Sequence, residues 1–273
     1  MQQNDFIEAS PLGDKSAYVT AYTPSLLFPI PRNTPWQPEF TTRPFYGIDV
    51  WNAFEVSWLN EKGLPKMALA EFRIPADSPN IIESKSFKLY LNSFNQTKME
   101  NISQVQSAME DDLSEAAGAE VKVALYSLRD MAMPVLPTPG ANIDQQDIEI
   151  TTYTPNASLL SSDVSTYRTE ILHSNLLKSN CPVTGQPDWA TLIVEYEGPT
   201  INRAGLLAYI VSYREHGDFH EQCVEQIFLD IKAQCKPGQL TVYARYVRRG
   251  GLDINPYRST RPLAPSNHRT QRQ

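Results

Sequence analysis

The most reactive side chain of this sequence, Cys181, lies in a segment unsuited to a helix or a strand. Residues 179–188 read SNCPVTGQPD, and their prolines and glycine interrupt regular structure between two expected strands. A thiol on a loop can reach a substrate, and it becomes a nucleophile when a base or a positive field removes its proton. Asp188 is the candidate proton partner. The alternative is a half-buried loop cysteine with Asp188 as a turn residue.

His220 and Glu221 form a second candidate pair, in the first turn of a helix expected over residues 218–235. A helix N-terminus on the ligand side presents an imidazole and a carboxylate to a heterocycle. A structural explanation competes with this one, because Asp218 and Glu221 have the spacing of an N-terminal capping box. The pair is therefore a candidate binding site with an open alternative.

Zinc binding is a further possibility for the same region. His220 and Cys223 are one helical turn apart, and Cys181 could complete a Cys2His zinc site. Against this, the sequence has no C-x-x-C pair, and Cys223 and Cys235 fall on the apolar stripe of the expected helix. We therefore interpret both of these cysteines as core residues and assign no metal site.

Two segments outside this region carry groups suited to phosphate or to a base edge. Residues 82–90 (IESKSFKLY) place an acid, a hydroxyl and two lysines in the opening turns of a helix. The alternative is a helix cap, since Asn80 and Glu83 have capping-box spacing and the lysines could be solvated. The RRGG run at 248–251 offers forked donors and close backbone approach, or else is a charged edge strand. With 12 glycines and no G-x-G-x-x-G or Walker A loop, no standard phosphate cradle is present.

Hydrophobic periodicity predicts a similar order of elements in both halves of the chain. The first half shows strands over 52–60 and 66–74 around a turn, helices over 84–94 and from 103 to Gly118, and strands over 121–125 and 146–153. The second half shows strands over 169–177 and 189–197, helices over 203–216 and 218–235, and a strand over 239–249. We infer an α+β fold with two modules, each an antiparallel sheet with two helices on one face in the order ββααββ. The halves share little residue identity.

The domain organisation follows from these elements. We expect an extended, proline-rich lead-in over residues 1–45, one module over 46–155, a second over 165–258, and a C-terminal tail over 259–273. The tail is polar, and we expect it to fray after the last strand.

Composition limits the classes of function. Lys and Arg number 24 against 31 Asp and Glu, and this net charge of −7 argues against direct nucleic-acid binding, which depends on neutralising phosphates. The longest apolar run, residues 206–211, is far below the ~20 residues of a membrane span. Three cysteines without a secretory leader are typical of a reducing compartment. We expect a cytoplasmic protein without membrane contact.

Several of these motifs together resemble the 7-cyano-7-deazaguanine reductases, the QueF family of queuosine biosynthesis. The resemblance is carried by ESKSFKLYLNSFN at 83–95, LKSNC at 177–181 with Asp188, FHEQC at 219–223, and RRGGLDINP at 248–256. It covers residues 44–258. The family has the tunnelling fold (T-fold), whose module is a ββααββ unit. The chain resembles the long form with two modules, because the ESK motif and the cysteine lie in different halves.

The resemblance implies roles for the candidate residues. Cys181 would add to the nitrile of 7-cyano-7-deazaguanine to give a covalent thioimide, and Asp188 would donate the proton; two NADPH would then reduce it to the aminomethyl product. Substrate-binding residues would be Ile82, Glu83, Ser84, His220 and Glu221. NADPH-binding residues would be Ser84, Lys85, Arg249 and Gly250.

A homodimer is also implied, with the site completed within one chain or across the dimer. The alternatives are a zinc-dependent cyclohydrolase-like enzyme of the same fold and a non-catalytic purine-binding module.

Overall fold

The structure is a computed structural model that describes residues 19–32, 43–129 and 134–273. These residues fall into two compact units. The first lies within Met1–Arg43, Asp49–Ala132 and Arg248–Asp253, and the second within Pro44–Ile48, Met133–Val247 and Ile254–Gln273. Each unit combines antiparallel strands with two longer helices, so the predicted α+β class is confirmed.

The first unit contains three paired strands in the order β5-β3-β2. Its elements are the 3-10 turn Pro24–Leu26 and the segments β1 (Pro29–Pro31), β2 (Tyr46–Leu59), β3 (Pro65–Pro75), β4 (Asn80–Ile82), α2 (Ser84–Ser93), α3 (Ile102–Ala117) and β5 (Lys122–Ser127). The predicted hairpin is confirmed: β2 and β3 join through a turn in which Gly63 has a φ of 82°, a value that glycine adopts without strain.

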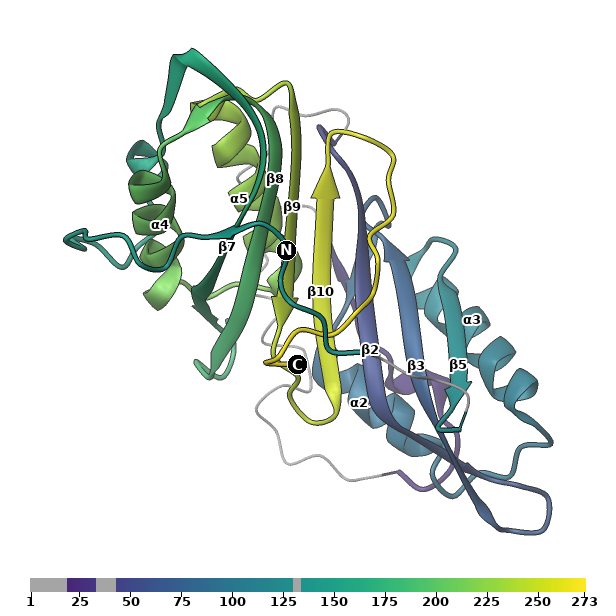
Figure 1. Ribbon diagram of the computed structural model, residues 1–273. Coiled ribbons are helices and arrows are strands. Elements are labelled where there is room, and N and C mark those ends of the chain that lie inside the picture. Colours follow the sequence, from purple (N-terminus) through teal and green to yellow (C-terminus); the bar gives the residue numbers. More distant parts are fainter. Residues whose placement is uncertain (1–18, 33–42, 130–133) are drawn as a thin grey trace. The chain divides into compact units, whose positions relative to one another are not determined.

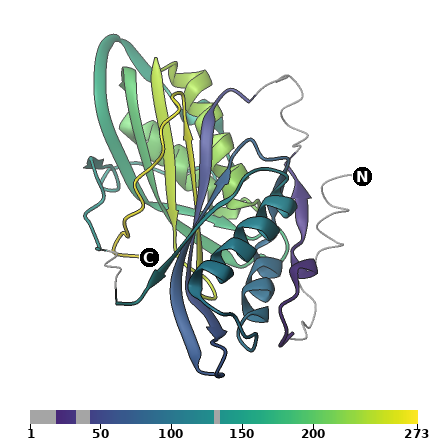
Figure 2. The ribbon, with the colours of Figure 1, turned by 90° about the vertical axis from the view of Figure 1, so that its right-hand side faces the viewer.

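Alternating burial explains how α2 and α3 cover one face of these strands (Figure 2). On β3, alternate apolar side chains including Phe72 and Ile74 are buried. Phe87 of α2 packs with its ring centroid 5.0 Å from that of Trp51 on β2 and 5.0 Å from that of Phe72. The core of this unit therefore lies between α2 and the sheet.

Most of the described part of the proline-rich lead-in belongs to this unit, namely residues 19–32 and Arg43, whereas Pro44 and Phe45 belong to the second unit. Residues 1–18 and 33–42 of the predicted lead-in lie outside the described residues. Between them, β1 pairs antiparallel with β4, with Pro29 opposite Ile82 and Ile30 opposite Ile81. Prolines fit this short two-stranded edge because few of its backbone N–H groups are needed for pairing.

The second unit has the strand order β10-β9-β8-β7-β6. Its elements are β6 (Ala141–Asn142), a 3-10 turn (Ala157–Leu159), β7 (Ser162–Asn180), β8 (Pro187–Ile201), α4 (Arg203–Ser212), a 3-10 turn (Tyr213–Glu215), α5 (His220–Cys235), β9 (Gln239–Tyr246) and β10 (Leu252–Ser259). Helices α4 and α5 cover one face of the β7, β8 and β9 strands (Figure 1). The apolar stripe of α5, with Cys223 and Cys235, is buried, so the prediction that both cysteines are core residues is confirmed.

The predicted ββααββ order is wrong in the first unit, whose described strands end at β5. In the second unit the order holds from β7 to β10, with the two-residue strand β6 before it. The strand expected over 146–153 does not form; those residues belong to the second unit and alternate only between partly and fully exposed positions. Two isoleucines in a polar segment imitate the period of a strand, but without a buried face they have nothing to pack against.

The expected fraying of the C-terminal tail is also wrong. Gln273 is only 5% exposed. Its side-chain carbonyl accepts from Arg245 Nε at 2.9 Å, and its amide donates to Asn255 Oδ1 at 2.9 Å. These buried polar bonds fix the end of the described chain on the sheet of the second unit.

Each unit contains the same hydrogen-bonded element between its two helices. In the first, the Tyr90 hydroxyl donates to Asp112 Oδ2 at 2.6 Å, and in the second the Tyr209 hydroxyl donates to Asp230 Oδ2 at 2.6 Å. In both, a serine three residues after the tyrosine returns a 2.6 Å bond to the tyrosine carbonyl. The repeat therefore extends to individual side chains, which the low overall identity of the halves conceals.

Candidate active site

Cys181 lies on the tight turn between β7 and β8, as predicted from its loop sequence. Its backbone N–H donates to the Gln186 carbonyl at 2.8 Å, and its carbonyl accepts from Gly185 N at 3.0 Å. Gly185 has a φ of 65°, the left-handed conformation that allows the chain to turn back here. The cysteine is partly exposed. A fixed backbone with an accessible side chain is what a nucleophile at a turn requires.

The loop before α5 pairs with the end of β7 and so approaches the Cys181 turn. Asn180 N donates to the His216 carbonyl at 2.8 Å, and Asp218 N donates to the Asn180 carbonyl at 3.2 Å. The residue next to Cys181 is therefore bonded on both sides to the segment that leads into His220. This pairing brings two segments far apart in the sequence to one end of the second unit.

Asp188 and His220 are in contact. Asp188 is the second residue of β8, directly opposite Ser179 of β7, and it is 4% exposed. His220 Nε2 lies 3.4 Å from Asp188 Oδ2. A buried carboxylate beside an imidazole can hold a proton at a defined position, which is the basis of acid catalysis. The structure thus brings together Asp188 and His220, two of the residues predicted from sequence.

The N-terminus of α5 differs from the predicted capping box. The helix begins at His220, its N-cap is Phe219, and no side chain caps it; Asp218 Oδ1 accepts instead from Phe219 N at 2.9 Å. Glu221 therefore lies within the first turn, where the positive end of the helix dipole favours a carboxylate. Its side chain is 2% exposed. The capping-box alternative for Glu221 is wrong. Helix capping therefore does not explain why the Glu221 side chain is buried.

In the first unit, Glu83 is the N-cap of α2. Its two carboxylate oxygens accept from Lys85 N and Ser86 N, both at 2.7 Å. The alternative of an Asn80–Glu83 capping box is wrong, because Glu83 is itself the N-cap of this helix. The side chain is fully buried, and this burial raises the pKa of Glu83 from its ordinary value, against the opposing effect of its two backbone hydrogen bonds and of nearby lysines.

The other predicted residues of the first unit surround this cap. Ile82 ends β4 and is buried, while Ser84 and Lys85 open α2 and are partly exposed. Arg249 and Gly250 lie in the turn before β10, where Arg249 N donates to the Leu252 carbonyl at 2.9 Å. Gly250 and Gly251 have positive φ values of 58° and 72°.

A pocket of about 260 Å³ in the first unit brings some of these residues together. Lys85 and Gly250 line it, and so does Lys88, the second lysine of the 82–90 segment, which was not among the expected NADPH-binding residues. Lys88 follows Lys85 at the helical spacing that places both on one face of α2, a signal visible in the sequence. Glu55 also lines this pocket; a Cβ on Gly251 would lie 2.6 Å from its carboxyl carbon. Ser84 and Arg249 are not among the lining residues.

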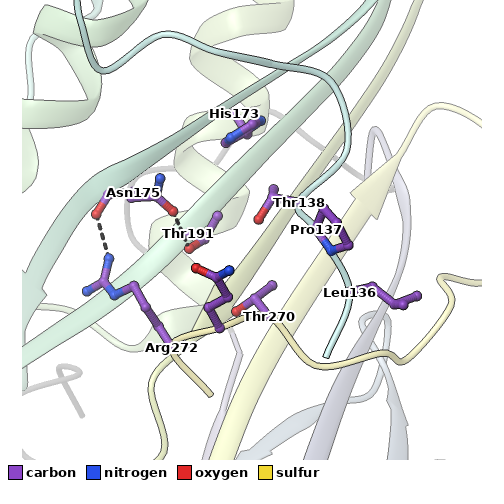
Figure 3. A pocket seen from close by; sticks show the side chains of 9 residues that line it. Leu136, Pro137, Thr138, His173, Asn175, Thr191, Thr270 and Arg272 are labelled. Atoms are coloured by element: carbon purple, nitrogen blue, oxygen red, sulfur yellow. Dashed lines mark hydrogen bonds between the residues drawn. The ribbon is translucent and has the colours of Figure 1, made fainter. Parts of the chain in front are cut away.

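A second pocket, of about 430 Å³, lies in the second unit and contains none of the predicted residues (Figure 3). His173 and Arg272 are its basic side chains. His173 Nδ1 is 2.9 Å from the Pro139 carbonyl, and Arg272 donates to the Asn175 carbonyl at 2.6 Å. Both groups are thus engaged with the backbone, and the pocket lacks a thiol or a carboxylate for chemistry.

The predicted residues thus form two sets. One set, in the second unit, contains Cys181, Asp188, His220 and Glu221. The other, in the first unit, contains Ile82, Glu83, Ser84, Lys85, Arg249 and Gly250. Sequence reasoning did not assign Lys88 of the first unit to the cofactor, and it missed Tyr246 of the second unit, whose ring lies flat on that of His220 with centroids 3.7 Å apart.

Two further features bear on the alternatives. Within residues 19–32, 43–129 and 134–273, no three His, Cys, Asp or Glu side chains are grouped as metal ligands would be. The zinc alternative therefore gains no support from the geometry around Cys223. Among the described helices, none has both the length and the apolarity that crossing a bilayer requires.

Comparison with known proteins gives two family matches. Residues 18–125 match the family described as "Nitrile reductase, 7-cyano-7-deazaguanine-reductase N-term", and residues 187–264 match the family described as "QueF-like protein". Together they cover more than half of the chain. Among solved structures, the archaeosine synthase QueF-Like in the apo form is similar at 19% identity over 36% of this chain and 96% of that chain, with a TM-score of 0.30.

Proposed function

This chain belongs to the QueF family of nitrile reductases, and from that premise we propose that it reduces 7-cyano-7-deazaguanine to 7-aminomethyl-7-deazaguanine in queuosine biosynthesis, with NADPH as the reductant. The observation that carries the proposal is the arrangement at one end of the second unit. A partly exposed Cys181 lies on a fixed turn, and Asp188 and His220 are in contact beside the strand end that leads to it.

The first chemical step is addition of the Cys181 thiol across the nitrile. The sulfur forms a bond to the nitrile carbon, one carbon–nitrogen π bond opens, and its electron pair takes a proton at nitrogen. Asp188 supplies that proton and recovers one from the thiol, so the product is a neutral thioimide with all atoms retained. His220, 3.4 Å from Asp188, holds this carboxyl group in position and donates to or accepts from it as the proton moves.

The base of the substrate is held by carboxylates. A deazaguanine ring presents N–H donors along one edge, and a carboxylate is an acceptor that can take two of them. Glu221 in the second unit and Glu83 in the first are buried carboxylates suited to this role, with Ile82, Ser84 and His220 as further contacts. Their burial makes each such hydrogen bond stronger than it would be in water.

The pocket of the first unit fits the phosphate end of a dinucleotide. Lys85 and Lys88 provide two positive charges on one side, and Gly250 in a left-handed turn allows the backbone to approach a phosphate closely. Ser84 and Arg249 flank the lining residues in sequence and complete the proposed set. NADPH, when bound, supplies the hydrides of the two reductions. The balanced reaction consumes two NADPH and two protons for each nitrile.

The test is the oxidation of NADPH followed by its absorbance, with and without 7-cyano-7-deazaguanine. Two equivalents of NADPH consumed per substrate would support the proposal, and the absence of substrate-dependent oxidation would refute it. Replacing Cys181 by Ala should abolish turnover. Thr184, exposed on the same turn, provides the matched control: Thr184→Ala should keep the wild-type rate. Undiminished turnover in Cys181→Ala would refute the role of the thiol.

The assembly and the location remain proposals of the same kind. We propose a homodimer in the cytoplasm, without direct nucleic-acid binding. Light scattering of the purified full chain would measure the mass of the assembly, and a mass of one chain would contradict the dimer.

A further inference from the structure

Tyr246 packs directly against the His220 ring. It is the last residue of β9, and its side chain is fully buried on the side of the sheet that α5 covers. The two rings are stacked face to face, with centroids 3.7 Å apart and planes inclined by 3°. Aromatic pairs usually prefer offset or edge-to-face arrangements, so a parallel stack this close fixes the plane of the imidazole.

The hydrogen bonds of His220 do not by themselves fix that plane. Nε2 faces Asp188 Oδ2 at 3.4 Å, which is beyond a short charge-assisted bond. Nδ1 is buried, and no described residue makes a hydrogen bond to it. Functional histidines are commonly oriented by a hydrogen bond to the second ring nitrogen. Since that bond is absent among the described residues, packing must provide the orientation here.

The backbone of Tyr246 is in turn held on both sides. Its N–H donates to Asn255 Oδ1 at 3.1 Å, and its carbonyl accepts from Gln273 Nε2 at 3.3 Å. Gln273 Nε2 also donates to Asn255 Oδ1 at 2.9 Å. Asn255 is fully buried and Gln273 nearly so. The ring that supports His220 is thus attached to a rigid strand end, which limits its own movement.

We propose that Tyr246 is a positioning residue that holds the His220 imidazole against Asp188. We also propose that Gln273 stabilises the position of Tyr246 through the hydrogen bond to its backbone carbonyl. The inference rests on the proposed function in one respect, that His220 and Asp188 act on the substrate. It adds a residue that never touches the reacting atoms and assigns a role to the buried C-terminal segment.

The phenol hydroxyl is not needed for this role. Burial raises the pKa of Tyr246 well above its ordinary value, against the opposing effect of the Ser179 side chain, so the ring is neutral near pH 7. A neutral ring offers a flat packing surface and no charge to exchange. The proposal therefore separates the ring, which should matter, from the hydroxyl, which should not.

The variants Tyr246→Phe and Tyr246→Leu distinguish the role of the ring from that of the hydroxyl, because Phe removes only the hydroxyl and Leu removes both. Phe retains the stacked ring, and its turnover should stay within about threefold of the wild type. Leu removes the ring, and kcat should fall on the order of tenfold to a hundredfold, because small misplacements of a catalytic group have effects of this size. KM for the nitrile should change less than kcat. Equal damage by Phe and Leu, or full activity of a folded Tyr246→Leu, would overturn the proposal.

A second readout does not depend on turnover. In the free protein, the ring current of Tyr246 should shift the His220 imidazole proton signals upfield in NMR spectra of histidine-labelled protein, with His220→Asn for assignment. The shift should persist in Tyr246→Phe and disappear in Tyr246→Leu. If it is absent in the wild type, the stack does not exist and the inference fails. If it is present but the wild type shows no nitrile reduction, the proposed function fails instead.

Two more variants guard against a loss of folding. Tyr196→Leu removes another buried tyrosine, on β8, and is the matched control for packing; it should leave the His220 signals in place. Gln273→Ala keeps the Tyr246 ring and removes its backbone partner. We expect it to lower kcat in the same direction as Tyr246→Leu but by a smaller factor, with a partial change of the ring-current shift. No effect on either readout would contradict the role of Gln273.

Discussion

Replacing Glu83 by Gln separates the structural role of this residue from its proposed binding role. Glu83 caps α2 through two 2.7 Å bonds, to Lys85 N and Ser86 N, and its carboxylate is fully buried. Gln keeps one acceptor oxygen and loses the other, which costs about 1 kcal/mol for one hydrogen bond. Gln also removes a buried charge. Since burial raises the pKa of Glu83, ionising this group costs folding free energy, and its removal offsets the lost bond.

The expected free energy of unfolding of Glu83→Gln at neutral pH is therefore within about 1 kcal/mol of the wild type. Ala removes both acceptors and should cost about 2 kcal/mol, the sum of a lost cap and an unsatisfied buried N–H. Activity should behave differently. Loss of one charge-assisted bond to the base, about 2 kcal/mol, corresponds to an increase of about thirtyfold in KM for the nitrile with either variant.

The pH dependence of the free energy of unfolding tests the direction of the Glu83 pKa shift. A carboxyl group whose folded pKa is raised binds its proton more tightly when folded, so its contribution to stability is complete below the ordinary pKa and is lost as pH rises through the folded pKa. Gln has no such loss. The advantage of the wild type over Glu83→Gln should thus shrink as pH rises from 4 to 7.

Urea denaturation across that pH range measures this difference. Asn101→Ala is the matched control, because Asn101 caps α3 through a single 3.0 Å bond to Gln104 N in an exposed position, and its cost of about 1 kcal/mol should not depend on pH. An advantage of the wild type over Glu83→Gln that grows as pH rises would refute the reasoning, since it would mean that the folded protein prefers the ionised form.

Three further predictions follow from the two units. Lys88→Ala should raise KM for NADPH about tenfold with little change in kcat, in steady-state kinetics, because it removes one of two cations in the proposed phosphate pocket; an unchanged KM would place the cofactor elsewhere. Iodoacetamide at pH 8 should label Cys181 and spare the two buried cysteines, since burial raises the pKa of Cys235 to about 11 and raises the pKa of Cys223 well above its ordinary value; peptide mass spectrometry reads the sites, and early labelling of Cys223 would contradict the packing of α5. Gly251→Ala should lower stability by about 1–3 kcal/mol, because φ is 72° and the new Cβ would meet Glu55; a thermal midpoint equal to that of the wild type would show that the turn relaxes freely.

Local sequence signals predicted most of the regular elements. The stripe of α5, the left-handed Gly118 that ends α3, and the turn at Gly63 are encoded within a few residues, and the structure confirms them. The strand expected over 146–153 failed because periodicity does not report whether a buried face exists. Where a pattern is short and polar, the partner strand decides the outcome.

The site was less accessible to sequence reasoning than the fold. Position within an element could be predicted for Cys181 and Glu83, because prolines, glycines and caps act locally. The contact of Tyr246 with His220 joins β9 to the start of α5. The residues of β9 from Leu240 to Tyr246 are all buried, so burial along the strand does not indicate which of them meets the helix. The burial of Gln273 depends on acceptors and donors from two strands. Such contacts are tertiary, and no local pattern encodes them.

Intact-protein mass spectrometry tests the central claim most directly, because adduct formation by the Cys181 thiol needs no reductant. The full chain is incubated with 7-cyano-7-deazaguanine in the absence of NADPH. Addition across a nitrile loses no atoms, so the wild type should gain the full mass of the substrate, on a peptide containing Cys181. Cys181→Ala should gain nothing. An unmodified wild type at saturating nitrile, or an adduct on another residue, would contradict the account.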